Sequence, residues 1–243
     1  MLKNKLTLLL TCLLFSAGAR AEPAIAFSSE AVIKATIEQR MPGSKVDSVR
    51  PTPYSGLYEL RIGEQIFYTD KTAQYLIEGS IINTRTMENL TKARLDDINR
   101  ISFSDLPLEL AVKTVKGNGK RVIALFEDPN CPYCKRLHQQ ALKAVDNTTV
   151  YTFLYNVITP ESAAKSKNIW CAPDRNLALE EWMVDGKTPA GAAADCVDPN
   201  EPVLALGSKL HVSSTPTIFF ADGTRISGAP DGPGLEARLA TVK

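Results

Sequence analysis

Excess charge, long apolar runs and repeated segments are all missing from this sequence. The 243-residue chain has a formal net charge of +1, so it lacks the basic surplus that favours binding to nucleic acid or anionic membranes. Its longest largely apolar run, at 6–17, has 12 residues, whereas a membrane-spanning helix needs about 20. Because it also lacks low-complexity tracts and internal repeats, we expect a packed globular protein without membrane insertion.

The first 21 residues have the composition of a secretory signal peptide. Lys3 and Lys5 form a basic start, the apolar run follows, and Ala19 and Ala21 place small residues at the two positions that a cleavage site needs. Cleavage before Glu22 leaves 25 basic and 27 acidic residues, a net charge of −2. The sequence therefore predicts an exported protein.

Five cysteines are present, and they differ in their expected roles. Cys12 lies inside the apolar run and would be discarded with the signal peptide. Its use as a lipoprotein anchor is a weaker alternative, because the run continues past it. Four cysteines remain in the mature chain, namely Cys131, Cys134, Cys171 and Cys196. An even number in an exported protein is typical of disulfide bonds.

The N-terminal part of the mature chain predicts a small α+β unit over residues 22–82. An amphipathic helix at 29–40 is followed by strands at 58–62, 65–69 and 75–77. About 60 residues bury little core alone, so we expect this unit to be a dimerisation domain. Residues 83–105 are expected to be a helical linker, with the helix over 84–101. An ordinary surface helix is the alternative interpretation.

Residues 106–243 predict a larger α/β domain with helices packed on a mixed sheet. The expected order is strand, strand, helix, strand, helices, strand, helix. The strands are expected from Leu108, at 122–126, at 150–157 and at 217–220, and the helices at 131–145, within 161–210 and at 234–242. The apolar run at 122–126 is typical of a buried central strand.

Cys131 and Cys134 form a C-x-x-C motif at the predicted junction between that central strand and the next helix. Cys131 would begin the helix, where unpaired N–H groups and the helix dipole favour a thiolate. A thiolate is the nucleophile in disulfide exchange. Cys134, one turn later, could close the ring and release a mixed disulfide. Pro132 suits the first helical turn, because its missing N–H is not needed there.

A structural zinc site is the alternative for these cysteines. Cys131, Cys134 and His138 have ligand-like spacing, but a tetrahedral site needs a fourth ligand, and His211 is the only other histidine. We therefore expect neither a metal nor another cofactor. A metal analysis of the purified protein separates a metal carrier from a thiol enzyme.

Four segments resemble the DsbC/DsbG family of periplasmic disulfide isomerases. They lie at 68–79, 128–138, 169–172 and 214–217 and extend over nearly the whole mature chain. The resemblance implies an α+β N-terminal dimerisation domain followed by a thioredoxin-like catalytic domain with a helical insertion. It also implies a periplasmic location and a homodimer.

The resemblance assigns roles to particular residues. Cys131 and Cys134 would be catalytic, and Tyr133 and the pair Thr215-Pro216 would contact substrate, with Pro216 following a cis peptide bond. Similarity to DsbC-type members further implies a structural disulfide between Cys171 and Cys196.

Two departures from related proteins concern the redox site. The dipeptide between the two cysteines is Pro-Tyr, as in DsbG-like members, whereas DsbC usually has Gly-Tyr there. Leu125 stands where thioredoxins have a buried aspartate that helps to deprotonate the second cysteine. Glu127 or Asp128 could help instead, although we expect both to be solvated or capping residues. We expect His138 to lie on the helix surface.

The leading functional hypothesis is a homodimeric isomerase that attacks wrong disulfides in misoxidised exported proteins. The family resemblance implies a membrane reductase of the DsbD type as electron donor. A DsbG-like reductase of single oxidised cysteines is a related alternative. A dimeric chaperone with secondary thiol chemistry is another, and a substrate without cysteines would separate it from the enzyme.

Overall fold

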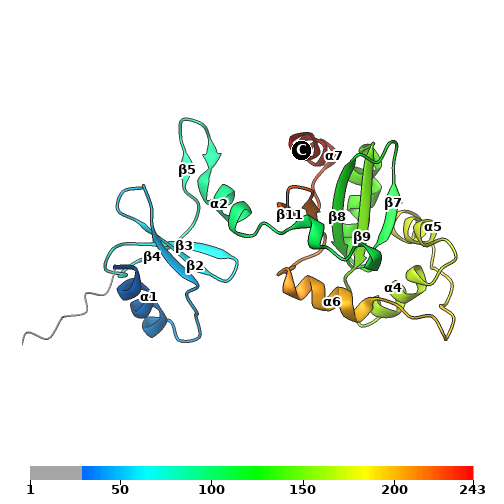
Figure 1. The fold of residues 1–243 in the computed structure, drawn as a ribbon, viewed down its shortest axis with the longest axis horizontal. Helices are drawn as coiled ribbons and strands as arrows, with labels where there is room; N and C mark the ends of the chain where they lie inside the picture. Colours follow the sequence, from blue (N-terminus) through cyan, green and yellow to red (C-terminus); the bar gives the residue numbers. More distant parts are fainter. Residues whose placement is uncertain (1–28, 243) are drawn as a thin grey trace, which may run out of the picture.

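The computed structural model describes residues 29–242, so the predicted signal peptide at 1–21 lies outside the described residues. Figure 1 shows a small N-terminal lobe and a larger C-terminal lobe, joined through helix α2 (Leu90–Ile98). Among the described residues, none of the helices combines the length and apolarity that a membrane span requires.

The N-terminal lobe is one helix packed on a four-stranded antiparallel sheet. Helix α1 spans Ser29–Arg40, and the sheet order is β1-β2-β3-β4. The strands are β1 (Ser48–Pro51), β2 (Tyr58–Ile62), β3 (Gln65–Thr69) and β4 (Leu76–Glu78). Its small core is built from Ile33, Ile37, Val46, Leu60 and Ala73. All three residues of the edge strand β4 are exposed.

The connection between the lobes differs from the predicted helix over 84–101. A two-stranded hairpin, β5 (Ile82–Asn83) and β6 (Glu88–Asn89), precedes α2. The Asn83 side chain accepts a hydrogen bond from the backbone N–H of Arg85 and closes the hairpin turn. The Asn89 side chain then caps α2 by accepting from Lys92 N. The predicted helix starts too early, because asparagine side chains bond the backbone and favour turns and caps over helix interiors. The helix also ends at Ile98, before the predicted end at 101.

The end of this connection is docked on the C-terminal lobe. The N–H of Ile101 donates to the carbonyl of Gly223 at 2.9 Å, and Arg100 donates to the carbonyl of Asp222 at 2.7 Å. Gly223 has a φ of +81°, and a Cβ at that position would lie 2.0 Å from the Ile101 oxygen. Only glycine fits there, because both the backbone conformation and the close approach exclude a side chain.

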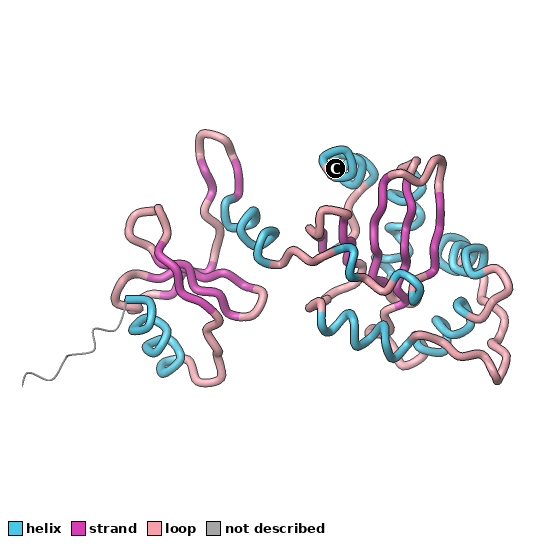
Figure 2. The backbone as a smooth tube through the Cα atoms, in the orientation of Figure 1, coloured by secondary structure: helices cyan, strands magenta, loops and turns pink. Residues whose placement is uncertain are grey.

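The C-terminal lobe contains a five-stranded mixed sheet of order β11-β10-β8-β9-β7, visible in Figure 2 as a second group of strands. The strands are β7 (Val112–Val115), β8 (Arg121–Glu127), β9 (Thr148–Leu154), β10 (Thr217–Phe220) and β11 (Arg225–Ser227). Central β8 is parallel to β9 and antiparallel to β10. The strand expected from Leu108 starts only at Val112, because short 3-10 turns around Pro107 precede it.

Helices cover both faces of this sheet, as the α/β prediction requires. They are α3 (Pro132–Leu137), continued by a π turn at His138–Leu142, α4 (Ser162–Trp170), α5 (Arg175–Glu180), α6 (Asn200–Lys209) and α7 (Gly232–Thr241). Ile123 and Leu125 of β8 face α3 and α7, whereas Ala124 and Phe126 face α6, since alternate strand residues point to opposite faces. Leu125 is therefore an ordinary core residue.

Candidate active site

The turn from β8 into α3 places Cys131 at the start of the helix. Cys131 is the N-cap residue, with extended backbone angles, and Pro132 occupies the first helical turn. The carbonyl of Cys131 accepts the N–H of Lys135, so the cysteine is joined to the helix. The unpaired N–H groups of the first turn surround this position, and they favour a negatively charged sulfur.

The loop before β10 lies directly against Cys131. The peptide bond between Thr215 and Pro216 is cis, and the Cys131 thiol donates a hydrogen bond to the Thr215 carbonyl at 3.4 Å. Tyr133, in contrast, is 58% exposed and its ring lies under the guanidinium of Arg136. The structure thus brings Cys131 and the Thr215-Pro216 pair together, with Tyr133 on the adjoining surface.

The two cysteines of the motif have different surroundings. Both are free thiols, with Cys131 2% exposed and Cys134 completely buried. Burial raises the pKa of Cys134 strongly, and the negative charge of Glu127 and the hydrogen bond with Cys131 raise it further. The second thiol is therefore held in its protonated form at neutral pH.

Asp128 is completely buried and ties the active-site turn to the segment after β9. Its carboxylate accepts the N–H groups of Val157 and Ile158 at 2.8 Å, the hydroxyl of Ser162 at 2.7 Å and the N–H of Asn130 at 2.7 Å. Asp128 is therefore neither solvated nor a helix cap, because the N-cap residues of α3 and α4 are Cys131 and Glu161.

Glu127 is neither solvated nor a capping residue, contrary to expectation. Its side chain is completely buried, and Nε2 of His138 lies 2.9 and 3.0 Å from its two oxygens. The His138 side chain is only 13% exposed, so the expectation of a surface histidine is also wrong. The sequence did contain a signal, because Cys134 and His138 are four residues apart and share one helix face.

Trp182 is a further residue of the site that sequence reasoning missed. Its indole N–H donates to the carbonyl of Pro129 at 2.6 Å, across 53 residues of sequence. The ammonium groups of Lys135 and Lys165 lie 3.7 and 3.8 Å from its ring centroid. Burial lowers the pKa of Lys135, and the charge of Lys165 lowers it further. Trp182 therefore holds the active-site turn and gathers positive charge beside it.

A disulfide joins Cys171 at the end of α4 to Cys196 in the loop before α6, with a sequence separation of 25 residues. These two cysteines lie outside the C-x-x-C turn. Within residues 29–242, His, Cys, Asp and Glu side chains form no group of three or more that could hold a metal ion.

Comparisons with known proteins assign the chain to a family. A model for the N-terminal domain of disulfide bond isomerase proteins matches residues 24–92, and a thioredoxin-like domain model matches residues 108–243. A probable thiol:disulfide interchange protein DsbC of Bordetella parapertussis is 47% identical over 85% of this chain and 73% of its own length. The chain belongs to the DsbC family.

More distant family members and a solved structure agree with this assignment. The thiol:disulfide interchange protein DsbC of Escherichia coli K12 is 29% identical over 83% of each chain. The crystal structure of a disulfide interchange protein from Neisseria gonorrhoeae is 37% identical, with a TM-score of 0.54. It is matched over 98% of its own length and over 56% of this chain. The predicted fold class, an N-terminal α+β domain followed by a thioredoxin-like domain, is confirmed.

Replacing both Cys171 and Cys196 by serine is predicted to destabilise the protein without impairing disulfide exchange. The bridge closes a loop of 25 residues, and the chain-entropy model gives about 3–4 kcal/mol for such a loop. Urea unfolding of the double variant measures the loss. In the wild-type mature protein with its active site reduced, thiol counting after unfolding in denaturant, without further reductant, should find two free thiols. Four free thiols would contradict a structural disulfide.

Proposed function

We propose that this DsbC-family protein isomerises or reduces non-native disulfides in exported proteins, with Cys131 as the attacking thiol. The observation that carries the proposal is the placement of Cys131, at the start of α3 and in contact with the Thr215 carbonyl. The signal-peptide pattern and the family membership support an exported, periplasmic protein.

The exchange begins when the Cys131 thiolate attacks one sulfur of a substrate disulfide. A mixed disulfide forms, and the other substrate sulfur leaves as a thiolate with the bonding electron pair. Isomerisation follows when another substrate thiolate attacks the mixed disulfide and restores free Cys131. Reduction follows when Cys134 attacks Cys131, which releases the reduced substrate and leaves Cys131 and Cys134 as a disulfide.

The protonated state of Cys134 favours isomerisation over reduction. Only a thiolate attacks a disulfide, and burial and Glu127 raise the pKa of this thiol. The mixed disulfide then lasts long enough for the substrate to pair its cysteines again. A protein that does complete the reduction needs an external electron donor, for which a membrane reductase of the DsbD type is the candidate.

Substrate would lie across the Thr215-Pro216 loop and an exposed apolar rim beside it. Tyr133, Val157 and Ile158 are each about half exposed, and the backbone of Val157 and Ile158 is bonded to Asp128 in the active-site turn. Exposed apolar side chains of this kind suit unfolded chains. The same rim supports the second candidate, a chaperone activity that needs no thiols.

A homodimer through the N-terminal lobe completes the proposal. Strand β4 ends the N-terminal sheet, and Tyr75, Leu76, Ile77 and Ile82 are all large apolar residues exposed on it or next to it. An exposed apolar edge strand is a template for pairing with another chain. The match to a disulfide bond isomerase N-terminal domain supports a second copy as the partner.

Cys131→Ser is predicted to abolish the isomerisation of scrambled ribonuclease, because it removes the attacking thiol. Cys134→Ser should retain part of the activity and accumulate mixed disulfides with substrate, since Cys131 can still attack. Recovery of ribonuclease activity measures the first effect, and non-reducing electrophoresis the second. An inactive Cys134→Ser together with an active Cys131→Ser would reverse the two roles.

Ile77→Lys is predicted to convert a dimer of the mature protein into monomers at micromolar concentration. The lysine would place a charge in the middle of the proposed edge-to-edge contact. Val115→Lys is the matched control, because Val115 is an exposed apolar residue on edge strand β7 of the other sheet. Sedimentation velocity distinguishes the species. A wild-type monomer, or equal effects of the two variants, would contradict the dimer proposal.

A further inference from the structure

The disulfide exchange described above gives neither Glu127 nor His138 a part in proton transfer, although burying a carboxylate is costly. An ionised group removed from water loses several kcal/mol of solvation unless it is paired. Glu127 is sealed at the end of β8 with both oxygens against Nε2 of His138. Cys134 lies one helical turn before His138 on the same helix face. The charge of Glu127 also raises the pKa of Cys134, the thiol that must lose a proton before it can attack.

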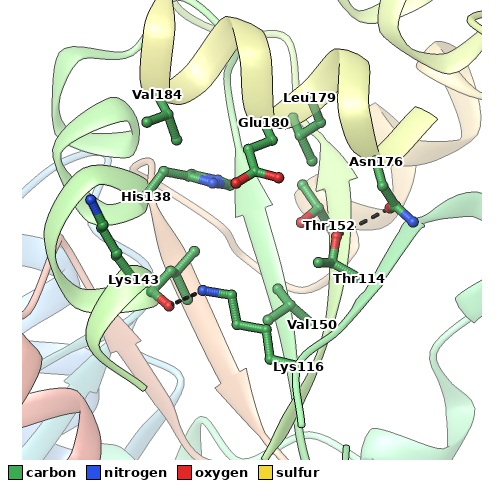
Figure 3. A pocket seen from close by; sticks show the side chains of 11 residues that line it. Thr114, Lys116, His138, Lys143, Val150, Thr152, Asn176, Leu179, Glu180 and Val184 are labelled. Carbon is green, nitrogen blue, oxygen red and sulfur yellow. Dashed lines mark hydrogen bonds between the residues drawn. The ribbon is translucent and has the colours of Figure 1, made fainter. Parts of the chain in front are cut away.

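His138 also lines a pocket of about 170 Å³ between the β7–β9 edge of the sheet and helix α5. Figure 3 shows His138 on the wall of this pocket, with side chains of β7, β9 and α5 opposite. The volume is enough for several water molecules. Thr152 also lines the pocket, and its buried hydroxyl has no hydrogen-bond partner within residues 29–242. A buried hydroxyl of this kind is a place where water binds.

Other charged groups face the pair from the surrounding elements. Lys116, Lys143 and Glu180 line the pocket, and Lys116 is partly engaged, because its ammonium donates to the Leu142 carbonyl. On the active-site side, the oxygens of Asp128 are occupied by backbone and hydroxyl donors. The Cys131 thiol donates a hydrogen bond to the Thr215 carbonyl. Among these groups, His138 alone joins the pocket to the buried carboxylate by a hydrogen bond.

We propose that Glu127 and His138 form a proton-transfer pair that takes the proton of Cys134 during the resolving step and passes it to water in this pocket. The inference rests on the proposed function, because it concerns the step in which Cys134 attacks the mixed disulfide. The pair would thus accept the proton that a buried aspartate accepts in thioredoxins. That aspartate is replaced here by Leu125, and Glu127 lies two residues further along the same strand.

In this step, the Cys134 S–H bond breaks and its proton goes to the Glu127–His138 pair. The Cys134 thiolate attacks Cys131, the Cys131–Cys134 bond forms, and the bond between Cys131 and the substrate sulfur breaks. The substrate thiolate leaves with the electron pair and is protonated by water. The cysteine pair is oxidised by two electrons and the substrate is reduced by two.

The arrangement couples the charge of Glu127 to the state of Cys134. The negative charge of Glu127 opposes a second negative charge on the buried sulfur. Accepting the proton removes that opposition, so the carboxylate and the thiolate do not have to be charged together. The protein therefore delays the resolving step but retains a route through it.

A single-turnover reaction with glutathione disulfide separates the two steps. Attack by Cys131 releases the first glutathione, and attack by Cys134 releases the second. Glu127→Gln keeps the shape of the side chain but removes the proton acceptor. We expect an unchanged first release and a second release that is at least about tenfold slower, since general acid–base catalysis typically contributes about 10²–10⁴-fold. The second rate should also become more steeply dependent on pH.

Glu201→Gln is the matched control, because it makes the same chemical change on an exposed carboxylate of α6. It should leave both releases unchanged. Absence of the first release in the wild-type protein would contradict the proposed function itself. A normal first release with equal second releases in the wild-type protein and Glu127→Gln would overturn the proton-transfer proposal alone. Equal slowing of both releases would indicate a structural role and would also overturn it.

His138→Ala provides an independent test, because removal of the ring enlarges the pocket at the point where the proton would leave. Added imidazole should restore the second release, whereas pyrazole, a ring of the same size that is a far weaker base, should not. Rescue by both rings would show that His138 only fills space, and rescue by neither would leave no role for a base at this position. Either result would overturn the proposal.

Discussion

The buried carboxylate of Asp128 holds together the parts from which the site is made. It lies between the central strand and the active-site turn, and its oxygens bind the turn itself, the segment after β9 and the start of α4. A buried carboxylate left without these donors would cost several kcal/mol. The three segments are therefore fixed relative to each other. This fixes the position of Cys131 at the start of α3.

The two cysteines differ in their chemistry because the active-site turn places them in different positions. Cys131 lies at the helix N-terminus beside the Thr215-Pro216 loop, on the side where a substrate can approach. Cys134, one turn later, is completely buried in an apolar cluster with Leu154 and Ile169 that Cys131 borders. One thiol is thus placed to attack and the other is kept protonated, although only Pro132 and Tyr133 separate them in the sequence.

The sequence predicted those features whose causes are local. The apolar run of β8, the cysteines after it and Pro132 between them indicate a strand, a turn and a helix start without any tertiary information. The hairpin at 82–89 was missed, although its asparagine turns are local, because the surrounding residues also suit a helix. The disulfide between Cys171 and Cys196 was predicted only through the family resemblance.

The residues that complete the site depend on distant parts of the chain. Trp182 donates a hydrogen bond to the Pro129 carbonyl across 53 residues of sequence, and no sequence pattern predicts such a contact. The burial of Glu127 depends on the sheet and helices that close over it. His138 was within reach of prediction, because its spacing from Cys134 places both on the inner helix face. A histidine on an exposed face would have carried no such role.

Selective alkylation tests most directly the central claim that the two thiols are inequivalent. The reduced mature protein is treated briefly with iodoacetamide at neutral pH, and the modified peptides are identified by mass spectrometry. The account predicts modification of Cys131, with Cys134 protected until the protein is unfolded, because burial and the raised pKa of Cys134 keep it from reacting. Modification of Cys134 as fast as Cys131, or before it, would contradict the account.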